Sequence, residues 1–584
     1  RPVFLNGYGH FAAVRRDVEK LSDYGLNIIQ VEFGPRSTVV SETEDSPAAI
    51  EDFAALLARA EAGNVAVNLL LSPHYFPQWA LEKWPELGGV DGGFIRYSVD
   101  APEARGILER HLRLTASQLR DKPALHSYCL SNEPIYVDPS SDRNNAQKWA
   151  AWLEQRHGTL DALNAAHRAT YESFEQVPVP VKAEARTTPL YHDWCRFNNE
   201  RFAGWHQWMA DVIHAEDAAA PVHTKEMNTF FHHAYMGWGV DPDQFCGFSQ
   251  IAGNDSWKYY EHRTGDWANG WQGENMHFDL LRSCRGQPIF NSENHVIADR
   301  DLEPIPGAHI RNVLWQAAIH GQGASTMWVW ERTFEARSDF SGSIMHRPDC
   351  ADAHGRVALD LMRLAPEVTA FQQAPARLAV IYSIASLVYG GQESERQLHR
   401  AYRALNFLGE KLDFVTEPQL ASGKAGQYAV IVAPGITHLP GGALQGLADF
   451  EGLVVTAGEA CLRRDDLDRP SRAARPAREA ALSDATDREL RGELAELLEA
   501  NGLRRTLVVL EADTDREAWG VEWQSVRRQG AWLVNLVNYT QRPIRVELRG
   551  LRGAGVDLIT GRPADVPLEL APLEPMLLRF GEPQ

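Results

Sequence analysis

Short apolar runs alternate with amphipathic stretches along the first two thirds of the chain. Asn27–Phe33 and Val65–Leu71 are such runs, and Val14–Tyr24 has helical spacing and stops at Gly25. Val65–Leu71 is almost wholly apolar, which is typical of a parallel strand buried on both faces. This alternation predicts repeated βα units around a parallel sheet.

Eight segments are candidate strands of that sheet. They are Asn27–Phe33, Val65–Leu71, a third strand at or beside Gly93–Tyr97, Leu125–Leu130, Val222–Lys225, Cys246–Gln250, Pro288–Asn291 and Ala324–Trp330. Helices are predicted at Pro102–Arg120 and Tyr191–Ala215, with a helical insertion over about 138–190. Eight βα units predict a (β/α)8 TIM barrel over residues 1–374.

The pattern changes after residue 375. Arg377–Tyr382, Tyr428–Ala433 and Gly452–Thr456 are strand-like, and Gln397–Leu412 is an amphipathic helix. These elements predict a small doubly wound, flavodoxin-like α/β domain over 375–503, without a dinucleotide-binding fingerprint. The segment Asp465–Ala500 is predicted to be exposed linker and helix.

Short alternating runs dominate the last part of the chain. Ala531–Val537 and Ile544–Leu548 alternate apolar and polar residues, as half-buried antiparallel strands do. We therefore predict a C-terminal β-sandwich domain over 504–584.

Composition and charge narrow the classes of partner. A net charge of -20 argues against nucleic acid and against anionic membranes, both of which attract concentrated Lys and Arg. No apolar run approaches the roughly 18 residues that span a bilayer. The six cysteines show no CxxC or Cys/His spacing, so we expect separate buried thiols, with neither a zinc site nor a disulfide framework. The chain starts at Arg1 without a signal-like stretch, which leaves the compartment open: cytoplasmic, or periplasmic or secreted if a leader was removed.

Two motifs contain candidate catalytic residues. Ser131-Asn132-Glu133-Pro134 and Asn291-Ser292-Glu293-Asn294 each follow an apolar run. Carboxylates at the C-terminal ends of barrel strands lie where such folds do chemistry. Two of them on distant strands are what cleavage of a glycosidic bond needs, one as proton donor and one as nucleophile or base. A single Asn/Glu motif often marks only the polar residues at the end of a strand. Two such motifs in this order favour a glycosidase.

Other polar and aromatic residues lie near predicted strand or loop ends and are candidates for binding sugar. Histidines there can bind hydroxyl groups or be structural, tryptophans can stack on sugar rings, and a carboxylate can bind a hydroxyl pair or form a salt bridge. Trp328 and Trp330 share one face if the strand alternation continues. The candidates are His10, His74, His223, Trp257, Trp328, Trp330 and Glu331. Glu32 is interpreted as structural.

The chain resembles glycoside hydrolase family 42 β-galactosidases in several segments. Gly7-Tyr8 through Gly25-Leu26-Asn27 is similar to the family's entry into its first strand, and Arg96-Tyr97-Ser98 to its segment before the third barrel helix. The most specific segment is Trp152-Leu-Glu-Gln-Arg-His-Gly-Thr-Leu-Asp-Ala-Leu-Asn164, which resembles the insertion after the family's acid/base glutamate. The cysteine cluster that binds zinc in some members is absent.

The resemblance implies a retaining glycosidase with Glu133 as acid/base and Glu293 as nucleophile. Their carboxyl groups should lie about 5–5.5 Å apart, and Asn132 should donate to the substrate's 2-hydroxyl. Burial and the charge of Glu293 should raise the pKa of Glu133. The resemblance also implies a homotrimer built through the α/β domain, with no cofactor.

The sequence leaves open which sugar the protein acts on. The expected activity is exo-acting hydrolysis of terminal neutral sugars, β-galactosidase-like, with β-mannosidase, β-glucosidase and α-L-arabinosidase as alternatives within the same clan of barrel enzymes. A non-catalytic carbohydrate-binding barrel is a rival of another class. A metal-dependent hydrolase is disfavoured because no His/Asp/Glu cluster has ligand spacing along the sequence.

Overall fold

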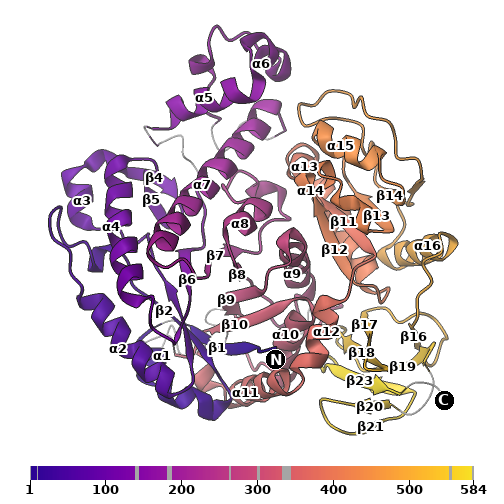
Figure 1. Cartoon of the computed structure of the whole chain (residues 1–584). Coiled ribbons are helices and arrows are strands. Elements are labelled where there is room, and N and C mark those ends of the chain that lie inside the picture. The colour runs from indigo at the N-terminus through magenta and orange to yellow at the C-terminus, as the bar shows by residue number, and fades with distance from the viewer. Residues whose placement is uncertain are drawn as a thin grey trace.

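Eight parallel strands close into a barrel in the computed structural model (Figure 1). The structure describes residues 2–9, 11–137, 142, 144–180, 187–261, 265–298, 301, 303–331, 343–551 and 555–581. The barrel order is β1-β10-β9-β8-β7-β6-β3-β2, and every neighbouring pair is parallel. The strands are β1 (Leu5–Gly9), β2 (Ile28–Glu32), β3 (Ala66–Leu70), β6 (Leu125–Asn132), β7 (Val222–Met227), β8 (Ala252–Asp255), β9 (Ile289–His295) and β10 (Gln322–Trp328). The predicted TIM barrel is confirmed.

The first barrel strand was not among the eight predicted strands. Strand β1 reads Leu-Asn-Gly-Tyr-Gly, which has too few apolar residues to stand out as a buried strand. Gly7 is required there, because a Cβ at this position would lie 1.6 Å from the carbonyl oxygen of Ile28. The segment predicted as a strand at Gly93–Tyr97 instead belongs to an antiparallel hairpin outside the barrel, formed by β4 (Gly88–Gly92) and β5 (Ile95–Tyr97).

The sixth predicted strand was placed too early in the chain. The predicted segment, Cys246–Gln250, overlaps helix α8 (Pro242–Phe248), and the strand β8 begins only at Ala252. The helix is favoured locally because the Asp241 side chain accepts a hydrogen bond from the backbone N–H of Asp243 and a proline opens the first turn.

Helices surround the barrel. Helix α4 (Pro102–Leu119) and helix α7 (Pro189–Glu216) confirm the predicted helices, whereas the helix predicted at Val14–Tyr24 is divided into α1 (Phe11–Arg16) and a 3-10 segment (Val18–Tyr24). The other helices of this part are α2 (Ala48–Ala62), α3 (Gln78–Lys83), α9 (Trp271–Arg285), α10 (Gly307–Ile319), α11 (Pro348–Arg363) and α12 (Ala365–Gln373).

A helical insertion stands at one end of the long helix α7 (Figure 1). It consists of α5 (Asn145–His157) and α6 (Leu160–His167). Residues 138–141, 143 and 181–186 of the predicted insertion lie outside the described residues. The described part matches the predicted helical character of this region.

A five-stranded parallel sheet of order β12-β11-β13-β14-β15 follows the barrel. This is the flavodoxin-like order of a doubly wound sheet, as predicted. The helix predicted at Gln397–Leu412 is displaced: helix α13 covers Ile384–Asn406, and Leu412 opens a strand that was not predicted. Gly409, with φ of 74°, lies in the turn between them. The elements are β11 (Leu378–Tyr382), β12 (Leu412–Thr416), α14 (Glu417–Ala421), β13 (Val430–Pro434), α15 (Gly441–Ala448), β14 (Leu453–Ala457), β15 (Glu479–Ala481) and α16 (Asp487–Ala500).

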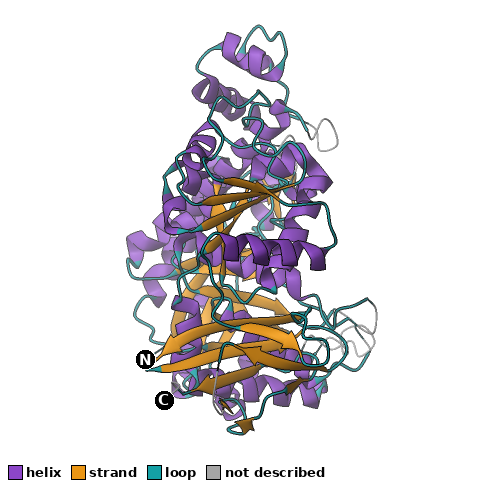
Figure 2. Cartoon of the chain, turned by 90° about the vertical axis from the view of Figure 1, so that its right-hand side faces the viewer, coloured by secondary structure: helices purple, strands orange, loops and turns teal. Residues whose placement is uncertain are grey.

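Two antiparallel sheets end the chain, as predicted. In Figure 2 the lower part of the molecule, where the chain ends, is rich in strands. One sheet has the order β16-β19-β22 and the other β17-β18-β23-β20-β21. Their strands are β16 (Val508–Glu511), β17 (Val521–Arg528), β18 (Ala531–Asn538), β19 (Ile544–Arg549), β20 (Gly555–Asp557), β21 (Pro563–Ala564), β22 (Leu568–Leu570) and β23 (Met576–Phe580).

All six cysteines are free and buried, which confirms the predicted small core thiols. Among the described residues, no helix is both long and apolar enough to cross a membrane.

Candidate active site

The two predicted catalytic glutamates lie at the C-terminal ends of barrel strands. Glu133 directly follows β6 and has a left-handed backbone, with φ of 38°, while Glu293 lies in the second half of β9. A non-glycine residue with positive φ costs free energy and is often found at functional sites. Glu133 is half-buried, and Glu293 is only 4% exposed. Both carboxyl groups are therefore held at the face of the barrel where TIM barrels do chemistry.

A buried lysine contacts the second glutamate. The Nζ atom of Lys225, on β7, donates to Glu293 Oε2 at 2.5 Å and to Asn132 Oδ1 at 2.9 Å. The register of the sheet creates this contact, because Asn132 on β6 pairs with Lys225 on β7. Asn132 in turn donates from Nδ2 to Glu133 Oε1 at 3.3 Å. A continuous chain of contacts thus joins the two glutamates through a cation and an amide.

Burial and neighbouring charge act on Glu133 in the predicted direction. Burial raises the pKa of Glu133, and the negative charge of Glu293 raises it further, while Lys225 and His295 oppose the shift. Asp255, at the end of β8, shows the same effect, because burial and the charge of Glu293 raise its pKa well above its usual range. A carboxyl group whose pKa is raised by a neighbouring carboxylate is suited to act as a general acid beside a nucleophile.

His295 lies between Glu293 and Asp255. Its Nε2 atom is 3.4 Å from Glu293 Oε1 and 3.5 Å from Asp255 Oδ1. These three residues are close enough to share a metal ion, and a second such group is formed by His157, His167 and Asp193. The sequence showed no three-residue ligand spacing because Asp255 lies on β8 and the other two members on β9, and because the second group draws its members from α5, α6 and α7. The ammonium group of Lys225 already neutralises Glu293, and this opposes a divalent cation at the first group.

Two tryptophans flank this histidine. Trp257, just after β8, forms a backbone bridge with His295, and Trp328, the last residue of β10, has its ring 5.6 Å from the His295 ring. Both indoles are half-buried. Trp257 and Trp328 are therefore neighbours of His295, which itself lies next to Glu293.

The predicted histidines differ in their surroundings. The ring of His74 packs on Tyr75 at 4.2 Å, and its buried Nδ1 has no hydrogen-bond partner among the described residues. Burial lowers the pKa of His74 to about 4, and the charge of Lys225 adds to this, so His74 is neutral and near the site. His223 is fully buried in the barrel, where Nε2 accepts from Asn68 and Nδ1 donates to the Thr224 carbonyl.

Trp330 and Glu331 contact other residues. Strand β10 ends at Trp328, so the alternation that would align Trp330 with it does not continue. The Trp330 ring packs on Tyr8 at 5.0 Å, and Glu331 forms an ion pair with Arg16 at 3.4 Å. Glu32, interpreted as structural, accepts hydrogen bonds from Ser72 and Tyr75. His10 lies outside the described residues.

Sequence reasoning missed Lys225, Asp255 and His295. A signal for Lys225 existed, because a lysine in the middle of a buried parallel strand is rarely found without a partner. Asp255 and His295 carried no such signal, since polar residues are common where strands end.

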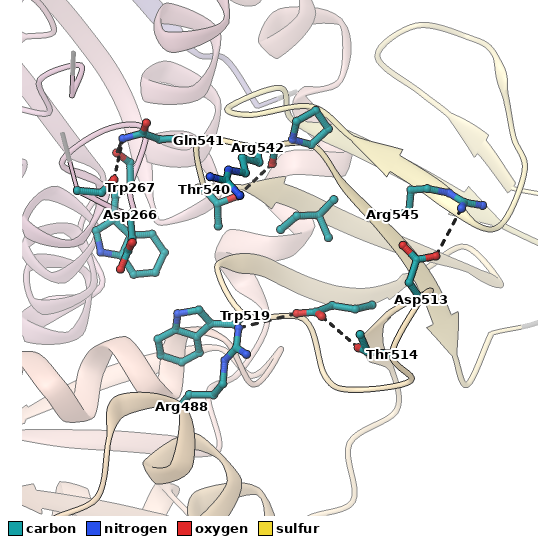
Figure 3. Close-up of a pocket in the computed structure, with 14 residues that line it drawn as sticks. Asp266, Trp267, Arg488, Asp513, Thr514, Trp519, Thr540, Gln541, Arg542 and Arg545 are labelled. Atoms are coloured by element: carbon teal, nitrogen blue, oxygen red, sulfur yellow. Dashed lines mark hydrogen bonds and ion pairs between the residues drawn. The ribbon is translucent and has the colours of Figure 1, made fainter. Parts of the chain in front are cut away.

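A cavity of about 870 Å³ lies elsewhere, between the loop at 265–267, helix α16 and the C-terminal sheets (Figure 3). Trp267 and Trp519 lie on one side of it, and Arg545 faces Asp513. Arg545 is 3.5 Å from Asp513, and Arg488 is 3.9 Å from Glu511. Each of these two carboxylates faces an arginine, whereas Glu133 and Glu293 act on each other. We therefore place the candidate active site at the barrel and not at this cavity.

The fold and the site define a class: TIM-barrel proteins with an interacting pair of glutamates at the ends of β6 and β9. The family model for glycoside hydrolase family 42, described as β-galactosidase, matches residues 10–369. The chain belongs to this family.

Relatives and solved structures agree with this assignment. The β-galactosidase BgaA from Thermus sp. is 26% identical over 425 residues, which cover 65% of this chain and 63% of the relative. The chain thus matches less than two thirds of the length of this relative. An apo exo-carrageenase of the family from Bacteroides ovatus has a TM-score of 0.87 at 22% identity, covering all of this chain and 82% of that one. A catalytic mutant of Gan42B, a family 42 β-galactosidase from G. stearothermophilus, has a TM-score of 0.79 at 16% identity, covering 99% and 98%.

Proposed function

We propose that this protein is an exo-acting, retaining β-glycosidase that hydrolyses terminal, non-reducing neutral sugars, with β-galactosides as the substrate class. The observation that carries the proposal is the pair Glu133 and Glu293, in which burial and the charge of one carboxylate raise the pKa of the other. The family and the curated β-galactosidases it includes support the choice of galactosides.

The reaction proceeds in two displacements. In the first, Glu133 donates its proton to the glycosidic oxygen while Glu293 attacks the anomeric carbon, so the leaving group departs as an alcohol and an ester to Glu293 forms. Esterification removes the charge of Glu293, and the pKa of Glu133 falls. Glu133, now a carboxylate, takes a proton from water as that water attacks the anomeric carbon and breaks the ester. The sugar leaves with its original configuration.

The contacts of each candidate residue decide which role in sugar binding we propose for it. Asn132, held between Lys225 and Glu133, is proposed to donate to the 2-hydroxyl, an interaction that strengthens in the transition state. Trp257 and Trp328 are proposed as stacking faces beside the pair. We give His223 no sugar contact, because both ring nitrogens are engaged within the barrel.

The first experiment is hydrolysis of a panel of nitrophenyl glycosides by the wild type and Glu293→Gln. The panel contains the β-galactoside, β-glucoside, β-mannoside, β-fucoside and α-L-arabinoside. It also includes carrageenan oligosaccharides, because a structurally similar protein is an exo-carrageenase. We expect β-galactoside cleavage by the wild type and its loss in Glu293→Gln.

The matched control is Glu274→Gln. Glu274 is also a buried glutamate paired with a lysine, Lys258, at 2.7 Å, but it lies on α9 outside the site. It should lose stability and keep activity. Cleavage of another glycoside in place of the galactoside would change the sugar and keep the class. An NMR spectrum showing an inverted first product would refute the retaining mechanism, and no cleavage at all would favour a barrel that only binds carbohydrate.

A homotrimer assembled through the α/β unit at 375–503 is a further part of the proposal. It is supported by the sequence resemblance and by the flavodoxin-like strand order of this unit. Light scattering of the purified protein tests it, and a monomeric mass would refute it.

A further inference from the structure

Lys225 is a fully buried cation inside the proposed active site. Its relative exposure is 0%, and its Nζ lies 2.5 Å from Glu293 Oε2 and 2.9 Å from Asn132 Oδ1. Taking an ammonium group out of water is costly unless it is paired and hydrogen-bonded. The contacts with Glu293 and Asn132 satisfy this requirement, so the lysine and the proposed nucleophile stabilise each other in the ionised form.

The lysine also determines which way the amide of Asn132 faces. An ammonium group has three N–H donors and no acceptor, so it can bind only the oxygen of an amide. With Oδ1 held by Lys225, the NH2 group of Asn132 is turned toward Glu133. The donor is thus presented beside Glu133, where the sugar of the proposed reaction would bind.

We propose that Lys225 is a positioning residue of the glycosidase site, which holds Glu293 for attack and turns the NH2 group of Asn132 toward the sugar. This role rests on the proposed function. It extends that function by assigning one cation to both the nucleophile and the 2-hydroxyl donor, two groups that come from different strands.

The ionisable groups around Lys225 make the pH profile an informative readout. Among the described residues, the titratable groups whose charges interact with Lys225 or Glu293, from β3 to β9, are His74, Tyr75, Cys129, Glu133, His223, Asp255 and His295. Replacing Lys225 by a neutral residue removes a positive charge that contacts Glu293 and acts on Glu133. The pKa values of Glu293 and Glu133 should then both rise.

A second buried lysine provides a matched control. Lys258 Nζ lies 2.7 Å from Glu274 Oε2 and 3.2 Å from Asn275 Oδ1, and the side chains of Lys258 and Glu274 are both 0% exposed. It therefore repeats the arrangement of a lysine between a glutamate and an asparagine. Its partners lie on α9, and not on β6 or β9, which position the two proposed catalytic glutamates.

The experiment compares Lys225→Met, Lys225→Arg and Lys258→Met. For Lys225→Met we expect kcat/KM to fall on the order of 100-fold, as for misplaced reacting groups. The acidic and basic limbs of its profile of kcat/KM against pH should both move to higher pH by about 1 unit. Lys225→Arg keeps the charge, so its limbs should stay near the wild-type positions even if activity falls. Lys258→Met should lose stability without moving either limb.

A double-mutant cycle between Lys225→Met and Glu293→Gln tests the contact without substrate. Urea unfolding should show that the double variant loses less stability than the sum of the two single variants. Additive losses would overturn the proposal. Limbs that stay in place in Lys225→Met, or that move equally in Lys225→Arg, would also overturn it.

The activity of the wild type distinguishes a failure of the role proposed for Lys225 from a failure of the proposed function. An active wild type with unshifted limbs in Lys225→Met overturns the role of Lys225 alone. A wild type that cleaves no glycoside overturns the proposed function, and this role with it.

Discussion

Two clusters of charged side chains shift the pKa of a carboxyl group in opposite directions. At the barrel mouth, Glu133 lies near a second carboxylate, and its own carboxyl group receives a hydrogen bond from the amide of Asn132. Where the helical insertion packs on α7, Asp193 of α7 is fully buried and accepts from Arg156, His157 and His167 at 2.7–2.8 Å.

The result is opposite in the two clusters. Burial by itself would raise the pKa of both groups, and it does so for Glu133, with the charge of Glu293 in the same direction. For Asp193 the hydrogen bonds of His157 and His167 and the charge of Arg156 outweigh burial and hold the pKa far below its usual range. The kind and number of neighbours, and not depth alone, decide whether a buried carboxyl group can donate a proton.

The two clusters are suited to different work. Asp193 ties α5 and α6 to α7, and Arg156 extends the network to Asp466 of the α/β unit at 2.7 Å. A group held so strongly as an anion stabilises structure. The raised pKa of Glu133 suits it to the proposed role of proton donor.

The largest expected effect is on catalysis. Glu133→Gln removes the proposed proton donor, so hydrolysis of a galactoside with a poor leaving group should slow by about 10²–10⁴-fold. A nitrophenyl galactoside needs less protonation and should be affected less in the first displacement. Measuring kcat/KM for both substrates checks this, and an equal loss for the two would argue against an acid role.

The next effect is on stability. Asp193→Asn removes the charge on which three donors converge, and removal of one partner from a buried ionic network costs about 3–5 kcal/mol. Urea unfolding measures it. Asp211→Asn, an exposed substitution on the same helix, should change stability by less than about 0.5 kcal/mol. A loss in Asp193→Asn no larger than in this control would mean that the network contributes little.

The smallest expected effect is on the pH dependence of the free energy of unfolding, which should have opposite signs for the two carboxyl groups. The raised pKa of Glu133 contributes stability that is present below its unfolded value of about 4.3 and is lost as pH rises through the folded value. The lowered pKa of Asp193 contributes stability that is present above about 3.9 and is lost as pH falls toward the folded value. The wild type should therefore lose its advantage over Asp193→Asn on acidification, and should lose stability relative to Glu133→Gln as pH rises above about 4.3. Unfolding free energies at a series of pH values check both slopes, and slopes of equal sign would contradict the comparison.

Local pattern was sufficient for much of the fold. The apolar strand Ala66–Leu70 and the helices Pro102–Leu119 and Pro189–Glu216 were predicted because their periodicity is strong. Strand Leu5–Gly9 was missed because its glycine serves a close approach to a neighbouring strand, which only the closed barrel reveals. Strand Leu412–Thr416 was missed because the helical pattern before it was extended too far.

The sequence by itself determined the barrel, the α/β unit, the antiparallel end of the chain and the two glutamates that close β6 and β9. These follow from hydrophobic periodicity and from the rule that parallel strands present their C-terminal ends at one face. Only the tertiary structure decided which charges meet: Lys225 with Glu293 across 68 positions, and His157 with Asp193 across 36. Charge interactions depend on distance in space and on burial, and neither is written in the local pattern of residues.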